Sequence, residues 1–290
     1  IEHPCVLRPA KELAQSANKE YRLRQLIVDR SGRIIMSDVD KALSEYPPNI
    51  VSVMLANNET GVIQEVANIA EKSRKLDALI HTDAIQAFGK IPVSFPSLNV
   101  HAMTLSSHKI YGPKGAAALI IDKELVLRPQ IFGGGHEGGL RSGTENVPAI
   151  VGFGKACELS KLRMEKTTIH VTKLRTHLEK RLIEMGAIIF GMNAARLPNT
   201  SYFALPDIEG ETLVIRLERA GFLIASGAAC SSAAPGKSHV LDAMGVEPIL
   251  ARCAVRLSLG NSNTLEQINE FISALAFTVK ELKRISSVMI

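Results

Sequence analysis

Apolar runs alternate with amphipathic stretches along the chain, and each kind of pattern predicts its own element. Short continuous apolar runs are typical of strands buried on both faces, whereas an apolar residue at every third or fourth position predicts a helix. Pro4 suits the first turn of a helix, and Ser37 is placed to cap the next one. The first half predicts strands over residues 21–28, 50–55, 77–81, 102–105 and 116–121, and helices over residues 5–16, 37–46 and 64–75.

Strands that alternate with helices across short polar turns predict an α/β fold with a parallel sheet. In such sheets ligands bind outside the carboxyl ends of the strands. Any one polar residue at a strand end could be an ordinary loop residue, but a group of them at one edge predicts a binding site. The residues that follow predicted strands at this edge are Asn58, Asp83, Gln86, Ser106, His108 and Lys109.

The second half of the chain has shorter units, which follow a long amphipathic stretch at residues 148–185. That stretch predicts a linking helix with a solvated Lys- and Arg-rich face. Thr264 and Gln267 have the spacing of a capping box for the last helix. The elements predicted beyond the linking helix are strands over residues 187–190, 200–205, 222–224 and 253–260, and helices over residues 210–220 and 264–284. The domains predicted are a large one over residues 1–150, a linking region over residues 151–185 and a small α/β domain over residues 186–290.

Lys109 stands in a tight connection between two predicted strands, which Gly112 and Gly115 close. A lysine held in such a place can lose part of its hydration, which lowers its pKa and leaves a neutral amine. That amine can form a Schiff base with a carbonyl or an aldehyde cofactor. On these residues alone, Lys109 could equally be a loop residue of no chemical importance.

Three further features carry candidate chemistry. Cys230 lies among small residues at 226–236 and is expected on an exposed loop, where a thiol suits a nucleophile. Arg256 lies in the middle of a predicted strand and needs a partner, for which a carboxylate is suited. The glycine-rich segment 132–144 is either a mobile loop or an anion-handling loop. The remaining cysteines lie in periodic apolar patterns and are expected to be core residues: Cys5, Cys157 and Cys253.

Composition narrows the functional classes. The chain has 290 residues, of which 46% are hydrophobic, so a sizeable core is expected. Its net charge of +5 comes from 34 basic and 29 acidic residues without a dense basic block, which does not indicate nucleic-acid binding. No apolar run has transmembrane length. The four cysteines lack CxxC or metal-ligand spacing and indicate free thiols in a reducing compartment, so we expect a cytoplasmic protein without a metal site.

Six motifs occur in order along the chain, and together they are far more specific than any one of them. They resemble the cysteine desulfurases and selenocysteine lyases, which are pyridoxal-phosphate enzymes of the class V aminotransferase type. The resemblance covers essentially the whole chain and implies fold type I, with a mostly parallel sheet of the seven-stranded type and a smaller C-terminal α/β domain. The motifs are residues 58–61, 81–86, 106–115, 132–144, 226–230 and 255–260.

The resemblance implies a role for each candidate residue. Lys109 bonds covalently to pyridoxal phosphate and removes the α proton of L-cysteine. Asp83 pairs with the pyridine nitrogen, and Cys230 attacks the substrate sulfur and carries it away as a persulfide while L-alanine is released. The implied contacts of the others are the ring hydroxyl for Asn58 and Gln86, the ring face and proton movement for His3, the phosphate for Ser106, His108 and Thr144, and the substrate for Arg256 and Asn58.

The resemblance also implies a homodimer, in which Thr144 serves the other subunit, and a sulfur-acceptor protein for iron–sulfur cluster assembly or tRNA thiolation. Two alternatives stay open: a selenocysteine lyase with the same motifs, and a catalytically inactive scaffold. The family normally carries further residues ahead of the His3 position, including a turn that cradles the phosphate at a helix N-terminus. We therefore expect this chain, which begins at Ile1, to be part of a longer or split enzyme.

Overall fold

The computed structural model describes residues 1–16, 21–226 and 238–288. The chain divides into two compact units, which are described separately. One unit contains residues 1–42, 56–64 and 166–290, and the other contains residues 43–55 and 65–165. The domain limits predicted at residues 150 and 185 are not tested by this grouping and stay a prediction.

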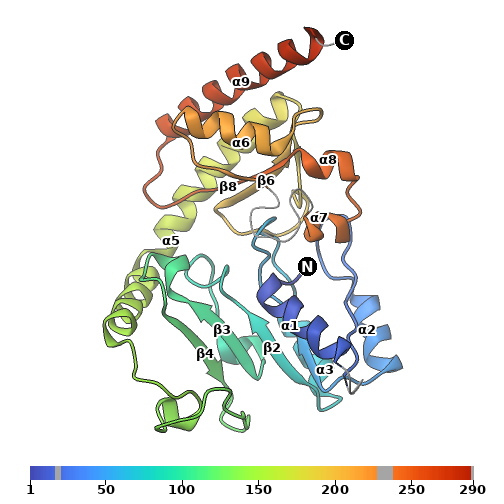
Figure 1. Ribbon diagram of the computed structural model, residues 1–290, viewed down its shortest axis with the longest axis vertical. Coiled ribbons are helices and arrows are strands. Elements are labelled where there is room, and N and C mark those ends of the chain that lie inside the picture. The colour runs from blue at the N-terminus through green and yellow to red at the C-terminus, as the bar shows by residue number, and fades with distance from the viewer. Residues whose placement is uncertain (17–20, 227–237, 289–290) are drawn as a thin grey trace. The chain divides into compact units, whose positions relative to one another are not determined.

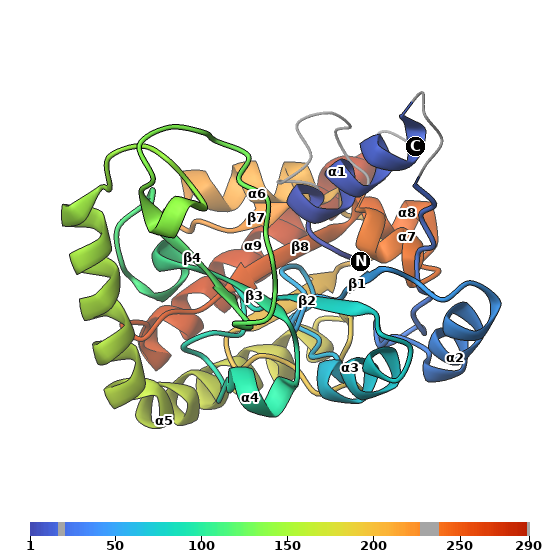
Figure 2. The same cartoon turned by 90° about the horizontal axis from the view of Figure 1, so that it is seen from below.

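The unit of residues 43–55 and 65–165 is built on a four-stranded sheet with the order β1-β2-β3-β4. Strands β1, β2 and β3 are parallel, and β4 is antiparallel to β3, so the sheet is mostly parallel as predicted. Figure 2 shows β2, β3 and β4 side by side, with helices α3 and α4 next to each other. The elements are β1 (Ile50–Ser52), α3 (Val66–Arg74), β2 (Leu79–Asp83), α4 (Phe95–Leu98), β3 (Ala102–Ser106), the 3-10 helix η1 (Ser107–Ile110), β4 (Ala117–Ile121) and the 3-10 helix η2 (Glu137–Gly139).

The other unit has an antiparallel sheet with the order β5-β6-β8-β7. Figure 1 shows α6 and α9 together on one side of β6 and β8. The long helix α5 (Val147–Glu184) begins in the unit of residues 43–55 and 65–165 and ends in this one. The other elements are α1 (Pro4–Gln15), α2 (Met36–Glu45), β5 (Ile188–Ile189), β6 (Thr200–Ala204), α6 (Gly210–Arg219), β7 (Ala225–Ser226), α7 (His239–Ala243), α8 (Pro248–Arg252), β8 (Ala254–Ser258) and α9 (Leu265–Val288).

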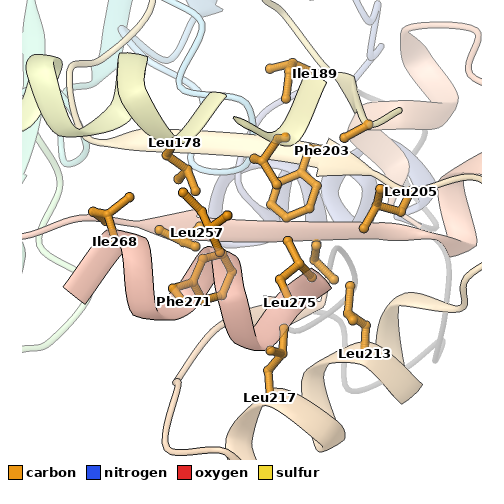
Figure 3. Packing of buried hydrophobic residues seen from close by; sticks show 14 of the residues in the cluster. Leu178, Ile189, Phe203, Leu205, Leu213, Leu217, Leu257, Ile268, Phe271 and Leu275 are labelled. Atoms are coloured by element: carbon orange, nitrogen blue, oxygen red, sulfur yellow. The ribbon is translucent and has the colours of Figure 1, made fainter. Parts of the chain in front are cut away.

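In the unit of residues 1–42, 56–64 and 166–290, a large hydrophobic cluster lies between the helices and the sheet. Leu213 and Leu217 of α6 and Phe271 and Leu275 of α9 point into the same space beside Leu257 of β8 (Figure 3). Burying each such side chain contributes roughly 1.5–3 kcal/mol to folding. This packing holds β8, the strand that carries the candidate substrate clamp, firmly in the sheet.

Most predicted elements are present with ends shifted by a few residues. The starts of two helices are fixed by the residues that cap them. Pro4 is the first residue of α1, and His3 caps that helix through its side chain. At the start of α9, the Thr264 N–H donates to Gln267 Oε1 at 3.2 Å, and the Gln267 N–H donates to Thr264 Oγ1 at 3.3 Å. The predicted capping box is therefore confirmed.

The strand predicted at residues 21–28 was wrong. Only Val28 pairs, with Ile34, in an isolated antiparallel bridge. The Ile27 N–H instead donates to Asp38 Oδ2 at 2.8 Å, and Arg24 pairs with the same carboxylate. The segment is bound to the first turn of α2 rather than to a sheet.

Three smaller predictions were also wrong. The strand predicted at residues 222–224 lies at β7, directly after that range. Ser37 does not cap α2, because the helix already begins at Met36. Ile50 is 61% exposed rather than buried on both faces, because β1 lies at the edge of the four-stranded sheet.

Among the described helices, none combines the length and the hydropathy that crossing a bilayer requires.

Candidate active site

Four of the predicted site residues lie at the carboxyl edge of the parallel sheet. Asp83 is the last residue of β2, and Ser106 is the last residue of the neighbouring strand β3. His108 and Lys109 follow at once in η1. Parallel strands end at the same edge of a sheet, which is where α/β folds bind ligands.

Lys109 is presented by a tight turn between β3 and β4. The Ser107 N–H donates to the Ala116 carbonyl at 3.1 Å, and the Gly112 N–H donates to the Ser107 carbonyl at 3.1 Å. A Cβ on Gly112 would lie only 2.1 Å from Ser107 Oγ and 3.1 Å from the Ser107 carbonyl oxygen, so a side chain there would force Ser107 to shift. Ser107 and Ile110 are buried, whereas the Lys109 side chain is exposed. The expectation that burial strips hydration from its amine was therefore wrong, because the turn directs Lys109 outward.

Asp83 is a buried carboxylate with one uncommitted oxygen. Its side chain is 5% exposed, and its Oδ1 accepts a hydrogen bond from the Ile85 N–H at 2.9 Å. Its Oδ2 accepts no hydrogen bond from the described residues. Buried charges are strongly disfavoured unless they are paired, so this oxygen is suited to a cationic donor.

A polar row lies beside Asp83 on the same face of the sheet. The two ring nitrogens of His81 each lie 2.8 Å from a hydroxyl, Nδ1 from Ser52 Oγ and Nε2 from Thr104 Oγ1. Burial lowers the pKa of His81, although the charge of Asp83 opposes that shift. The row therefore favours a neutral imidazole next to the carboxylate, which leaves the Asp83 charge without a cationic partner in the row.

Ser106 and His108 form a polar pair beside Lys109. Ser106 Oγ lies 2.8 Å from His108 Nδ1. Partial burial lowers the pKa of His108, and the nearby ammonium groups of Lys109 and Lys114 lower it further. A hydroxyl, an imidazole and two ammonium groups together are suited to an anion such as a phosphate.

Two other predicted residues are placed differently. The Gln86 side chain is turned toward Lys90, whose Nζ donates to Gln86 Oε1 at 3.0 Å. Thr144 is exposed on the loop that precedes α5, and no hydrogen bond among the described residues joins it to Ser106 or His108. Their predicted contacts with a cofactor stay predictions.

Asn58 and Arg256 lie together in the unit of residues 1–42, 56–64 and 166–290. Arg256 Nη1 donates to the Asn58 carbonyl at 2.9 Å. Arg256 Nε and Asn58 Oδ1 are buried, and within the described residues neither has a hydrogen-bond partner. Buried polar atoms in proteins are almost always paired. The two atoms are therefore suited to a ligand that both accepts and donates hydrogen bonds.

His3 lies directly before α1 and caps that helix. Its Nδ1 accepts from the Cys5 N–H at 3.2 Å and lies 2.9 Å from Cys5 Sγ. Asn57 Nδ2 donates to the Ile1 carbonyl at 3.0 Å, so the residues before α1 lie against the turn that contains Asn58. The prediction that Cys5 is a core residue was wrong, because none of the residues of α1 is buried.

The sequence interpretation missed a buried polar group around Glu59. Glu59 is 7% exposed, and its Oε2 accepts from Ser238 Oγ at 2.5 Å. The buried Tyr202 faces the same carboxylate. The only signal in the sequence was an acidic residue in a polar turn between apolar runs. Cys230 lies at residues 227–237, outside the described residues, so its role stays a prediction.

With this geometry in place, comparison with known proteins decides the family. The model of the family described as aminotransferase class-V matches residues 1–271. A cysteine desulfurase of Sinorhizobium fredii is 39% identical over 285 residues, which cover 98% of this chain and 73% of the relative. The chain belongs to the class V aminotransferase family.

A second relative and a solved structure add to this match. Cysteine desulfurase IscS of Dictyoglomus turgidum is 37% identical over 290 residues, covering 99% of this chain and 72% of the relative. The structure of a NifS-like protein of Rickettsia africae has a TM-score of 0.87 and 33% identity, and the match covers 97% of this chain and 74% of that one. The predicted resemblance to cysteine desulfurases and the predicted α/β fold of that family are confirmed. The relatives do not favour a selenocysteine lyase or an inactive scaffold.

Proposed function

We propose that this chain is a pyridoxal-phosphate-dependent cysteine desulfurase, which takes the sulfur of L-cysteine and releases L-alanine. The observation that carries the proposal is the position of Lys109. Its amine follows β3 directly, at the strand edge where Asp83, Ser106 and His108 also lie, in a chain whose relatives are cysteine desulfurases. Enzymes of this class need a lysine that forms a Schiff base and a carboxylate that pairs with the ring nitrogen.

The residues at this edge fit the cofactor. The uncommitted Oδ2 of Asp83 suits a protonated pyridine nitrogen, because that pairing compensates a buried charge. The Ser106 hydroxyl and the His108 ring suit the phosphate. Lys109 is exposed and can reach an aldehyde without first leaving a buried position. When bound, the cofactor would supply an electron sink that stabilises negative charge on the α carbon of the substrate.

The chain's own residues supply binding and proton transfer. The Lys109 amine would serve as the base for the substrate α proton. Arg256 binds the substrate carboxylate through Nε, and Asn58 Oδ1 accepts from a substrate or cofactor donor. Because His3 Nδ1 already accepts from Cys5, the His3 ring exchanges protons through Nε2. Gln86 and Thr144 complete the cofactor contacts, Gln86 after its amide leaves Lys90 and Thr144 from the other subunit of a homodimer.

The sulfur step assigned to Cys230 balances without an external oxidant. The bond between the β carbon of the substrate and its sulfur breaks, a bond between that sulfur and the Cys230 sulfur forms, and the β carbon gains a proton. Alanine leaves, and Cys230 is left as a persulfide. The β carbon is reduced by two electrons, and each of the two sulfur atoms is oxidised by one. We propose that the persulfide passes to a separate acceptor protein in the cytoplasm, for iron–sulfur cluster assembly or tRNA thiolation.

Substrate and thiol dependence test this proposal. The protein loaded with pyridoxal phosphate is given L-cysteine or L-selenocysteine, and alanine is measured for the wild type, Cys230→Ala and the control Cys157→Ala. We expect turnover of L-cysteine that Cys230→Ala abolishes and Cys157→Ala leaves intact, because Cys157 is a half-buried residue of α5. Turnover of L-selenocysteine alone, or turnover of L-cysteine that survives Cys230→Ala, would contradict the proposed sulfur transfer.

A further inference from the structure

Glu59 is a buried carboxylate to which the mechanism above gives no role. It lies directly after Asn58, in a turn that Asn57 organises. Asn57 Oδ1 accepts from the Glu59 N–H at 2.9 Å, from the Thr60 N–H at 3.0 Å and from Thr60 Oγ1 at 3.2 Å. Glutamate is rarely buried unless it is paired, so the contacts of this side chain require an explanation.

Three elements meet at the Glu59 carboxylate. Ser238, which caps α7 by accepting from the Leu241 N–H at 3.1 Å, donates its hydroxyl to Glu59 Oε2 at 2.5 Å. Tyr202 of β6 faces the carboxylate, and burial together with the Glu59 charge raises the pKa of Tyr202. The positive charge of Arg256 on β8 is also close enough to act on Glu59. Glu59 therefore lies among groups that donate or attract toward its oxygens.

The peptide bond between Asn58 and Glu59 links this carboxylate to Arg256. Its carbonyl, that of Asn58, accepts from Arg256 Nη1 at 2.9 Å, and its N–H, that of Glu59, donates to Asn57. A peptide unit is planar, so fixing its N–H and the side chain of Glu59 also fixes the direction of its carbonyl. The turn that contains the anchored Glu59 thus also sets the direction of the carbonyl that binds the guanidinium.

Arg256 is oriented from a second side by its own strand. It lies opposite Tyr202 of β6 and opposite Ala225 of β7 in the antiparallel sheet. One of its terminal nitrogens is engaged by the Asn58 carbonyl, while its buried Nε has no partner within the described residues. The arm is therefore fixed at one terminal nitrogen, and a donor next to it still needs an acceptor.

Stability does not explain a glutamate here. Burial raises the pKa of Glu59, against the opposing effects of the Ser238 hydrogen bond and the Arg256 charge. Keeping a charge buried has a desolvation cost that close contacts often fail to recover, and a neutral side chain of the same shape is often equally stable or more so. A carboxyl group kept in surroundings that raise its pKa points to a functional role.

We propose that Glu59 is a positioning residue that sets the direction of Arg256 for the substrate carboxylate. This inference rests on the proposed function, since it deepens the role of Arg256 in binding L-cysteine. Glu59 does not touch the substrate in this proposal. It acts through the Asn58 carbonyl and through its charge on the guanidinium.

Steady-state kinetics of Glu59→Gln tests the proposal, with Glu65→Gln as the matched control. Glu65 is an exposed glutamate six positions further along the chain. We expect Glu59→Gln to raise KM for L-cysteine about 10- to 100-fold, the size of effect that misplacing a binding group has, with a smaller change in kcat. Glu65→Gln should match the wild type. Cysteamine, which has the amine and thiol of cysteine but no carboxylate, should compete equally well in Glu59→Gln and in the wild type.

Coupling to Arg256 separates positioning from a general structural role. In an Arg256→Lys background, Glu59→Gln should add little further loss, because both changes remove the same oriented contact. Ser238→Ala, which removes the anchoring hydrogen bond but keeps the charge, should raise KM in the same direction by less, and it provides the test if Glu59→Gln does not fold. An unchanged KM, an equal loss for L-cysteine and cysteamine, or additive effects with Arg256→Lys would overturn the inference. A wild type that does not turn over L-cysteine would instead overturn the proposed function, and this inference with it.

Discussion

At the residue scale, the carboxylates of Asp83 and Glu59 have opposite surroundings. Asp83 lies beside His81, whose pKa is lowered by burial, at an edge that holds two lysine ammonium groups. Glu59 lies among a serine, a tyrosine and an arginine and has a raised pKa. The first arrangement is suited to pairing with a cation, and the second to holding a neighbouring guanidinium in place.

The raised pKa of Glu59 predicts a pH dependence of stability. In the folded state the group binds its proton more tightly than in the unfolded state, where its ordinary value is 4.5. The stability it contributes is therefore fully present below pH 4.5 and is lost as the pH rises through the raised folded value. Arg256, a charged group that faces it, opposes the shift, while Ser238 and Tyr202 carry no charge in that range.

Urea unfolding at a series of pH values measures this effect. The difference in unfolding free energy between the wild type and Glu59→Gln should move in favour of the variant as the pH rises above 4.5. Glu65→Gln, at an exposed position, serves as the control and should show no such trend. A difference that stays flat with pH, or moves toward the wild type, would show that burial does not raise the pKa of Glu59.

Sequence reasoning reached some of these residues and not others for a physical reason. Lys109, Asp83 and Arg256 could be predicted because their motifs lie at recognisable strand ends or inside a strand. Glu59 could not, because its burial depends on Ser238, which lies far away in the sequence. The exposure of Lys109 was missed as well, since it depends on how the turn after β3 is hydrogen bonded.

At the element scale, helix predictions succeeded where the signal is local. The capping box of α9 depends on two residues three positions apart, and the structure has both of its hydrogen bonds. The strand predicted at residues 21–28 failed because a strand needs a partner, and partner strands are not encoded within the segment. Local propensity therefore fixed where helices begin more reliably than which segments join a sheet.

A buried ion pair joins α5 to the segment that follows β5. Arg196 donates to both oxygens of Glu179 at 2.8 and 2.9 Å, and the two side chains are 5% and 11% exposed. Arg175 lies nearby, and its pKa is lowered by burial and by the charge of Arg196. Removing Glu179 would leave two arginines close together without their carboxylate.

We expect Glu179→Ala to destabilise the fold by about 3–5 kcal/mol, the usual cost of leaving a buried charge without its partner. The control is Glu158→Ala in the same helix, which breaks an exposed pair with Lys155 and should cost no more than about 1 kcal/mol. Thermal unfolding followed by circular dichroism measures both. Equal losses for the two variants would mean that burial of the Glu179 pair has no energetic consequence.

At the scale of the whole molecule, each of the two units has its own sheet. The mostly parallel sheet presents Asp83 and Lys109 at its carboxyl edge, and the antiparallel sheet presents Arg256 from β8. The family relationship was predictable from the sequence because six motifs occur in order over the chain. The grouping of residues 1–42 with the C-terminal part was not, since it depends on contacts between distant segments.

The attachment site of the cofactor tests the central claim most directly. The protein is incubated with pyridoxal phosphate and reduced with borohydride, which makes a Schiff base permanent, and the modified lysine is located by peptide mass spectrometry. We predict modification at Lys109, which is lost in Lys109→Ala and not replaced by modification at the neighbouring Lys114. Absence of the adduct, or its appearance on another lysine while Lys109 stays unmodified, would contradict the claim that Lys109 bonds to the cofactor.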